Sequence, residues 1–346
     1  MRVVYSARYH IDIGPHVFPT RKYPLVHARL VETGVIRPSD VVEPAPASWD
    51  DLSRVHTAAY LAKMRDGTLS PEEAAQLELP WSAGMVEAFR IMVGGTVQAA
   101  RIACGLQTDG QPQRPQRTQR NHISADSASS AVDVVCHIGG GLHHAFPNHG
   151  EGFCPFNDVA VAVCDLRSRG LERAAVIDLD VHQGNGTAFI FSQRGDGAPV
   201  PRGERDVPEV FTFSMHQQHN YPMWKPKGSL DVGLPDGAGD SRFLRELEQA
   251  LPVVMASDPQ CVFYLAGADP YEDDQLGGLR LTRDGLRQRD RMVIDTVRAA
   301  GVPLVITLAG GYARHVEDTV GIHVATIEEA KRAATATRSR EVREVQ

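Results

Sequence analysis

Short, continuously apolar runs separated by longer amphipathic segments dominate the pattern of hydrophobic positions along the chain. Continuous apolarity indicates strands that are buried on both faces, which is typical of a parallel sheet covered by helices on each side. The predicted strands are Arg2–Tyr5, Asp133–Ile138, Ala174–Asp180, Val210–Ser214, Cys261–Ala266 and Pro303–Leu308.

Amphipathic segments of helical length lie between several of these runs. The predicted helices are Met85–Cys104, Asn157–Arg169, Ser241–Ala256 and Arg283–Ala300, with Asn157 as the N-cap of the second. Because β-α-β crossovers are right-handed, this order predicts an α/β fold: a three-layer α/β/α sandwich around a mainly parallel central sheet. The alternation continues through most of the chain, so we expect one domain over residues 1–330.

Two segments lack this pattern. Residues 105–121 repeat Gln, Arg, Pro and Thr with almost no apolar positions, which predicts a mobile surface loop. Residues 331–346 are charged, and we expect a C-terminal tail that either frays or forms an exposed helix.

Composition excludes several classes of function. A net charge of −7 and a pI near 6.1 argue against a nucleic-acid partner, since phosphate contacts require clustered Lys and Arg. No apolar run approaches the length of a membrane span, and the N-terminus does not resemble a signal peptide. The five cysteines show no CxxC spacing and lie mostly in apolar runs, so we expect a reduced, cytoplasmic protein.

Polar residues that can bind a metal stand where predicted strands end. Asp180 and His182 are two residues apart, so in an extended segment their side chains leave the same face of the backbone. Asp269 ends another apolar run and can supply a third ligand. One imidazole and two carboxylates suit Zn²⁺, and the same set accepts Fe²⁺ or Mn²⁺. Taken alone, the Asp-x-His pattern also fits a surface turn.

Two further strand ends carry groups suited to proton transfer. His143 and His144 follow three glycines, and Asp178 and Asn185 are candidates to orient their rings. Tyr312 follows two glycines after the last apolar run, where a phenol can donate a hydrogen bond to a developing oxyanion. Each feature also has a structural interpretation: a histidine pair without catalytic role, or a tyrosine packed under a turn.

Taken together, these motifs resemble those of the histone deacetylase family, which has the arginase/deacetylase fold. The matching stretches, in family order, are VYSARYH, RVHTAAYL, GGGLHHAFPNHGEGFCPFNDVAVAV, AAVIDLDVHQGNGT, LAGADPYEDDQLGGLRLT and LAGGYAR, and they span roughly residues 3–325. The HQGNG sequence, in place of HHGDG, and the AGADPYEDDQLGGL segment are most similar to the class IV branch.

The resemblance assigns roles to the candidate residues. It implies Asp180, His182 and Asp269 as zinc ligands, Tyr312 as the phenol that stabilises the oxyanion, and His144 as the general base and acid. His143, paired with Asp178, would act mainly electrostatically. Asn185 departs from the acidic partner that many relatives have for the second histidine. Because an amide cannot stabilise the imidazolium as a carboxylate would, the pKa of His144 should be lower than in those relatives.

The resemblance also implies a structural potassium ion and a substrate tunnel. The implied potassium site comprises Asp178, Asp180, His182 and Ser214. The residues that would wall the tunnel for the acyl-lysine side chain are Gly141, Phe153, Tyr221 and Leu276. Ordinary core packing is the alternative interpretation of the aromatic residues among them.

The activity implied is metal-assisted hydrolysis of the amide in an acylated lysine side chain, with an acetyl or a longer fatty acyl group. Acetylpolyamines or other small acylated amines are alternative substrates, and a non-catalytic module that binds acyl-lysine is the alternative from another class. An arginase-like site with two metal ions would need carboxylates at positions 184 and 271. Those positions hold Gly184 and Tyr271, which favours a single ion.

Overall fold

The computed structural model describes residues 1–106, 134–192 and 209–344. One parallel sheet forms its centre, with the strand order β2-β1-β3-β8-β7-β4-β5-β6. The strands are β1 (Arg2–Val4), β2 (Val41–Val42), β3 (Val134–His137), β4 (Arg173–Asp178), β5 (Glu209–Gln217), β6 (Leu230–Leu234), β7 (Val262–Leu265) and β8 (Leu304–Thr307).

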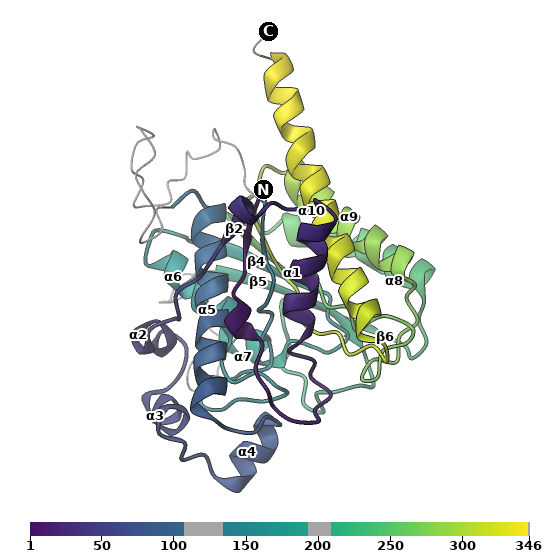
Figure 1. Ribbon diagram of the computed structural model, residues 1–346. Coiled ribbons are helices and arrows are strands. Elements are labelled where there is room, and N and C mark those ends of the chain that lie inside the picture. Colours follow the sequence, from purple (N-terminus) through teal and green to yellow (C-terminus); the bar gives the residue numbers. More distant parts are fainter. Residues whose placement is uncertain (107–133, 193–208, 345–346) are drawn as a thin grey trace.

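Helices cover both faces of this sheet, as Figure 1 shows, and make the predicted three-layer α/β/α sandwich. One layer contains α5, α6 and α7, and the opposite layer contains α1, α8, α9 and α10. The helices are α1 (Lys22–Glu32), α2 (Trp49–Ser53), α3 (Ala58–Asp66), α4 (Pro71–Leu77), α5 (Ala83–Ala103), α6 (Asp158–Arg167), α7 (Asn185–Ser192), α8 (Asp240–Met255), α9 (Arg283–Ala299) and α10 (Val316–Glu344).

Each predicted strand and helix has a counterpart within a few residues of the expected bounds. The largest difference in a strand is at β5, which continues to Gln217 rather than ending at Ser214. Asn157 caps α6 as predicted, because its Oδ1 accepts a hydrogen bond from the Ala160 amide at 2.9 Å. The pattern did not predict β2, β6, α1 to α4, α7 or the part of α10 before residue 331.

The two segments without a predicted pattern have different outcomes. Apart from its first two residues, the loop expected at 105–121 lies outside the described residues. The predicted tail continues α10, so the helical alternative holds as far as Glu344. The domain boundary at residue 330 stays a prediction.

The loops that carry the sequence motifs all leave the same end of the sheet. They follow β3, β8, β7 and β4, which are four consecutive strands in its centre. All residues of β3, β7 and β8 are buried, and only the first residue of β4 is partly exposed. Because the strands are parallel, their carboxyl ends all lie at this end of the sheet. This topology therefore gathers four sequence-distant motifs at one place.

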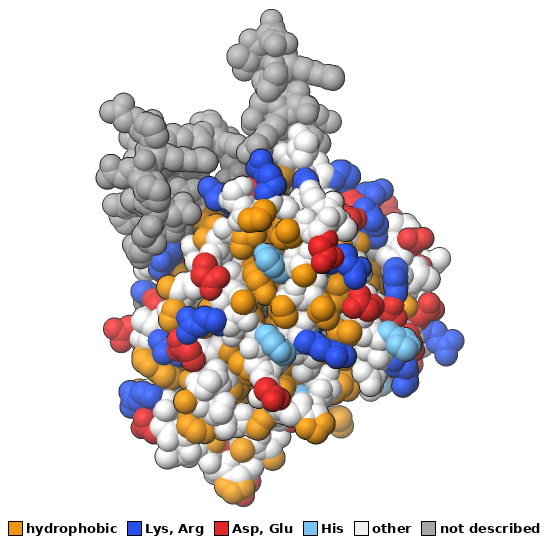
Figure 2. All heavy atoms as spheres, viewed as in Figure 1, with side chains coloured by type: hydrophobic (Ala, Val, Ile, Leu, Met, Phe, Trp, Pro, Cys, Tyr) orange, Lys and Arg blue, Asp and Glu red, His pale blue; other side chains and the backbone are white. Residues whose placement is uncertain are grey.

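The surface shown in Figure 2 carries interspersed acidic and basic side chains. Within the described ranges, every helix is too short or too polar to traverse a lipid bilayer.

Candidate active site

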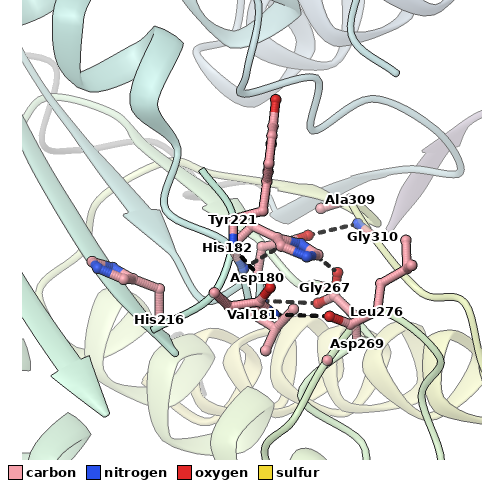
Figure 3. A network of polar contacts seen from close by, with 12 residues as sticks. Asp180, Val181, His182, His216, Tyr221, Gly267, Asp269, Leu276, Ala309 and Gly310 are labelled. Atoms are coloured by element: carbon pink, nitrogen blue, oxygen red, sulfur yellow. Dashed lines mark hydrogen bonds and ion pairs between the residues drawn. The ribbon is translucent and has the colours of Figure 1, made fainter. Parts of the chain in front are cut away.

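Three buried side chains converge where β4 and β7 end. Asp180 and His182 follow β4 and Asp269 follows β7, and their ligand atoms all lie within 4.8 Å of one another. His182 Nδ1 lies 3.0 Å from Asp180 Oδ1 and 3.5 Å from Asp269 Oδ2. Figure 3 shows the imidazole held between the two carboxylates. The structure thus brings together the three residues predicted as metal ligands.

The chemistry of this group fits a divalent cation. Asp269 Oδ2 is buried and has no hydrogen-bond partner among the described residues, although His182 approaches it. Burial and the charge of Asp180 raise the pKa of Asp269 to about 7. Two carboxylates and one imidazole enclosed away from water are a donor set that a divalent ion stabilises.

The backbone fixes the other carboxylate oxygens. The Gly310 amide donates to Asp180 Oδ2 at 2.8 Å, and the Val181 amide donates to Asp269 Oδ1 at 2.9 Å (Figure 3). A Cβ at position 310 would lie 2.5 Å from Asp180 Oδ2 and would also overlap Asp269 Oδ2. Only glycine therefore allows the loop after β8 to pass this close to the metal-binding group.

The paired histidines lie beside the metal-binding group, with ring centroids 4.0 Å apart. His143 Nδ1 is 2.7 Å from Asp178 Oδ2, and His144 Nδ1 is 2.7 Å from Asn185 Oδ1. Both predicted orienting contacts are present.

The two rings have opposite electrostatic surroundings. Burial alone would lower the pKa of His143, but the charges of Asp178 and Asp180 outweigh it and raise that pKa to about 9. Burial and the neighbouring imidazoles place the pKa of His144 well below its ordinary value. His143 is thus suited to remain a cation near neutral pH, and His144 to accept a proton.

Tyr312 enters the site from the loop after β8. Its ring centroid lies 6.5 Å from that of His182 and 5.9 Å from that of Phe153. Its backbone amide donates to Asp274 Oδ2 at 2.7 Å, and its carbonyl accepts from the Gln275 side chain at 2.8 Å. The loop after β7 therefore anchors the backbone of Tyr312.

These groups surround one cavity. Its lining includes His143, His144, Asp180 and Tyr312 together with Gly141 and Phe153, two of the four predicted tunnel residues. Of the other two, Tyr221 packs edge to face on His144 with centroids 5.0 Å apart, and Leu276 lies in the loop that follows Asp269. Neither Tyr221 nor Leu276 is part of the lining itself.

The backbone around the cavity is strained. Phe153 and Ala309 have φ values of 64° and 52°, which residues other than glycine rarely adopt. Such conformations cost roughly 1–3 kcal/mol each and persist only where the surroundings impose them. Both residues line the cavity, so the packing that imposes their conformations also shapes the pocket.

A family model described as "Histone deacetylase domain" matches residues 16–327. The chain belongs to the histone deacetylase family. It is 30% identical to a "Histone deacetylase-like amidohydrolase" of Pseudomonas aeruginosa over 85% of this chain and 71% of that protein. It is 29% identical to "Histone deacetylase 2" of Arabidopsis thaliana over 92% of this chain and 77% of that protein.

A higher identity, 39%, links this histone deacetylase family member to an uncharacterized protein of Picosynechococcus, over 93% of this chain and 95% of the other. Among solved structures, a histone deacetylase homologue from Aquifex aeolicus matches with a TM-score of 0.72 and 21% identity, over 95% of this chain and 83% of that one. This structural similarity confirms the predicted fold. The deacetylase family makes the protein a hydrolase.

The residues expected around potassium in this family member are neighbours: the Asp180 amide donates to Asp178 Oδ1 at 3.2 Å, and the His182 amide donates to Asp180 Oδ1 at 3.0 Å. Asp178 and Ser214 are paired across β4 and β5 and line a second cavity, together with Thr212 and Asp231. Asp180 and His182 are not part of that lining.

Sequence reasoning missed several residues of this histone deacetylase site. Lys22 is buried; its Nζ donates to the Ala309 carbonyl at 2.7 Å and lies 5.7 Å from the Tyr312 ring. Burial lowers the pKa of Lys22 to about 8. Phe18 lines the cavity, and Asp274 anchors Tyr312. No strand end or motif marks Lys22 or Phe18, whereas the acidic run before Leu276 was a signal that could have found Asp274.

Proposed function

We propose that this protein hydrolyses the amide bond of acylated lysine side chains with one divalent metal ion, most suitably Zn²⁺, held by Asp180, His182 and Asp269. The observation that carries the proposal is the convergence of this buried group with His144 and Tyr312 around one cavity. Fe²⁺ is the alternative ion for the same donors.

His144 serves as the general base. Its Nδ1 contacts Asn185 and its pKa is low, so the ring is neutral near pH 7 and Nε2 can take a proton from the attacking water. The same nitrogen then returns the proton to the departing lysine amine. A divalent ion at the three ligands supplies positive charge beside the acyl carbonyl.

Tyr312 and His143 stabilise the charge that develops on the acyl oxygen and around it. The hydroxyl of Tyr312 donates a hydrogen bond to the oxyanion from a loop that Asp274 holds in place. His143 remains protonated because of Asp178 and contributes a fixed positive charge.

The substrate assignment rests on the shape and chemistry of the cavity. Gly141 and Phe153 line it, and a Cβ at Gly141 would lie 2.6 Å from Ala309 Cα, so this wall has no space for a larger residue. The apolar part of this lining suits an unbranched lysine stem, and its polar part suits the amide. Small acylated amines have the same two features and are the competing substrate class.

A panel of three substrates tests the proposal. The metal-reconstituted protein is assayed on an acetyl-lysine peptide, a myristoyl-lysine peptide and N-acetylspermidine. We expect turnover of one of the peptides and a loss of roughly 10²- to 10³-fold in kcat for Tyr312→Phe, the range for removing one oxyanion donor. His144→Ala should lose at least as much, because it removes the base.

The matched control is Tyr5→Phe, which removes the hydroxyl of a tyrosine whose ring stacks on His27 and does not line the cavity. It should retain full activity. Equal product release from wild type, Tyr312→Phe and His144→Ala would contradict the enzyme assignment, and exclusive turnover of acetylspermidine would replace the lysine substrate with a polyamine.

We further propose a monovalent cation, with potassium as the candidate, near Asp178 and Ser214. The second cavity that these two residues line supports it. Membership of the class IV branch and a cytoplasmic location stay predictions from the sequence.

A further inference from the structure

Asn185 has a second partner on the side away from His144. Its Oδ1 faces His144 Nδ1 at 2.7 Å, and its Nδ2 donates to Glu151 Oε1, also at 2.7 Å. The hydroxyl of Tyr221 donates to the same Glu151 oxygen at 2.8 Å. Glu151 therefore links Asn185, which orients His144, to Tyr221, whose ring packs on His144.

The carboxylate of Glu151 is itself held in place. Its other oxygen accepts from Gln76 at 3.1 Å and lies 3.4 Å from His149 Nε2, and its side chain is 14% exposed. Burial would raise the pKa of Glu151, but hydrogen bonds from His149, Asn185 and Tyr221 outweigh it and lower that pKa. Glu151 is thus ionised near neutral pH and can only accept hydrogen bonds.

An acceptor at this position decides which way the Asn185 amide points. The two ends of an amide have nearly the same shape, so Asn185 could present either its oxygen or its nitrogen to His144. Because Glu151 accepts only, it requires Nδ2, and Oδ1 must then face His144. An oxygen at this place accepts a hydrogen bond, so Nδ1 must carry the hydrogen of the neutral ring, and the lone pair is then on Nε2.

We propose that Glu151 is a positioning residue that sets the tautomer of His144 through Asn185. This inference rests on the proposed function, in which His144 Nε2 is the base. The three residues are far apart in the chain: Asn185 is 34 residues after Glu151, and Tyr221 is 70 residues after it. In many relatives an acidic residue contacts this histidine directly. In this chain the amide of Asn185 lies between His144 and the carboxylate of Glu151.

The first experiment removes the acceptor. Glu151→Leu should lower kcat by roughly 10- to 100-fold, the range for losing a hydrogen bond to a charged group, with a smaller change in KM. The matched control is Gln76→Leu, which removes a different contact of the same carboxylate and should change kcat by less than about threefold. Equal losses in both variants, or a loss confined to KM, would mean that Glu151 only braces the loop.

The second experiment exchanges the charges and does not depend on Glu151→Leu folding. Asn185→Asp should be impaired, because it places two carboxylates in contact. Adding Glu151→Gln should restore activity, since the glutamine can donate to Asp at position 185. Glu151→Gln should therefore raise kcat in the Asn185→Asp background and lower or preserve it in the wild-type background. An effect of the same sign and size in both backgrounds would overturn the proposal.

The third experiment needs no substrate. Nitrogen-15 NMR of the zinc-loaded, histidine-labelled protein identifies the His144 signals as those absent from His144→Asn and shows which ring nitrogen carries the hydrogen. We expect Nδ1–H in wild type and a mixture or the other tautomer in Glu151→Leu. An unchanged tautomer in Glu151→Leu would refute the positioning role even if the protein is an active deacylase, whereas the expected change would support it even if none of the substrates tested is turned over.

Discussion

Replacement of Gly310 by alanine should abolish tight metal binding without unfolding the protein. The added Cβ would lie 2.5 Å from Asp180 Oδ2, whereas real Cβ atoms essentially never approach closer than 3.0 Å. Asp180 must therefore retreat by at least 0.5 Å, and Asp269 is overlapped as well. The φ of Gly310 is not positive, so the alanine causes no backbone strain of its own.

The size of the effect follows from how narrowly metal sites tolerate displacement. Ligand distances vary by only about 0.2 Å around their preferred values, so a shift of 0.5 Å in one carboxylate takes it out of range. Changes in residues that merely support ligands cost roughly 10- to 100-fold in metal affinity. Because two of the three ligands are displaced, we expect a loss of at least about 100-fold, or about 2.7 kcal/mol.

Competition with a chelator of known zinc affinity at fixed pH measures this loss, and thermal unfolding with and without zinc measures the linked stabilisation. The matched control is Gly84→Ala, in helix α5, where the nearest atom to the added Cβ is 3.9 Å away. It should keep the zinc affinity of wild type. One tightly bound zinc ion in Gly310→Ala, with wild-type affinity, would refute the assignment of this group as the metal site.

Three further outcomes are expected. Asp178→Asn should lower the pKa of His143 from about 9, because only the charge of Asp180 then opposes the effect of burial; a nitrogen-15 NMR titration that still gives a midpoint near 9 would contradict this. Asp274→Ala leaves the Tyr312 amide without its acceptor, so it should lower kcat about tenfold and the free energy of unfolding by about 1–3 kcal/mol. Asp273→Ala loses only an exposed ion pair with Arg314 and should be near neutral in both assays. Removal of the metal by a chelator should abolish turnover reversibly and lower the unfolding temperature, and full activity with less than 0.1 equivalent of metal by elemental analysis would contradict it.

The strands that the sequence predicted are those with the most uniform surroundings. β3, β7 and β8 lie in the centre of the sheet and are buried on both faces, so their hydrophobicity is continuous and easily recognised. The two missed strands, β2 and β6, form the two edges of the sheet. β2 has two residues, and in β6 buried positions do not form a continuous run, so neither gives the pattern of a central strand.

The same reasoning explains which site residues were predictable. Asp180, His182, Asp269 and Tyr312 stand directly after central strands, where topology alone brings them together. Lys22 gives no such signal: it begins helix α1, where a lysine normally points into water. Its burial depends on the Ala309 carbonyl, 287 residues further along the chain, and that contact exists only in the folded protein.

Residues placed by the central strands and residues placed only by tertiary contacts differ in how freely they can change among members of one fold family. Residues at the ends of β4, β7 and β8 hold the metal-binding group and cannot move without changing the sheet that places them. Glu151 lies instead in the long connection between β3 and α6, and it reaches Asn185 and Tyr221 through side chains alone. Because such a connection tolerates substitution better than a central strand, the electrostatic control of the base can vary while the metal site stays fixed. The distinctive chemistry of this chain is therefore expected in the surroundings of His144 rather than at the three metal ligands.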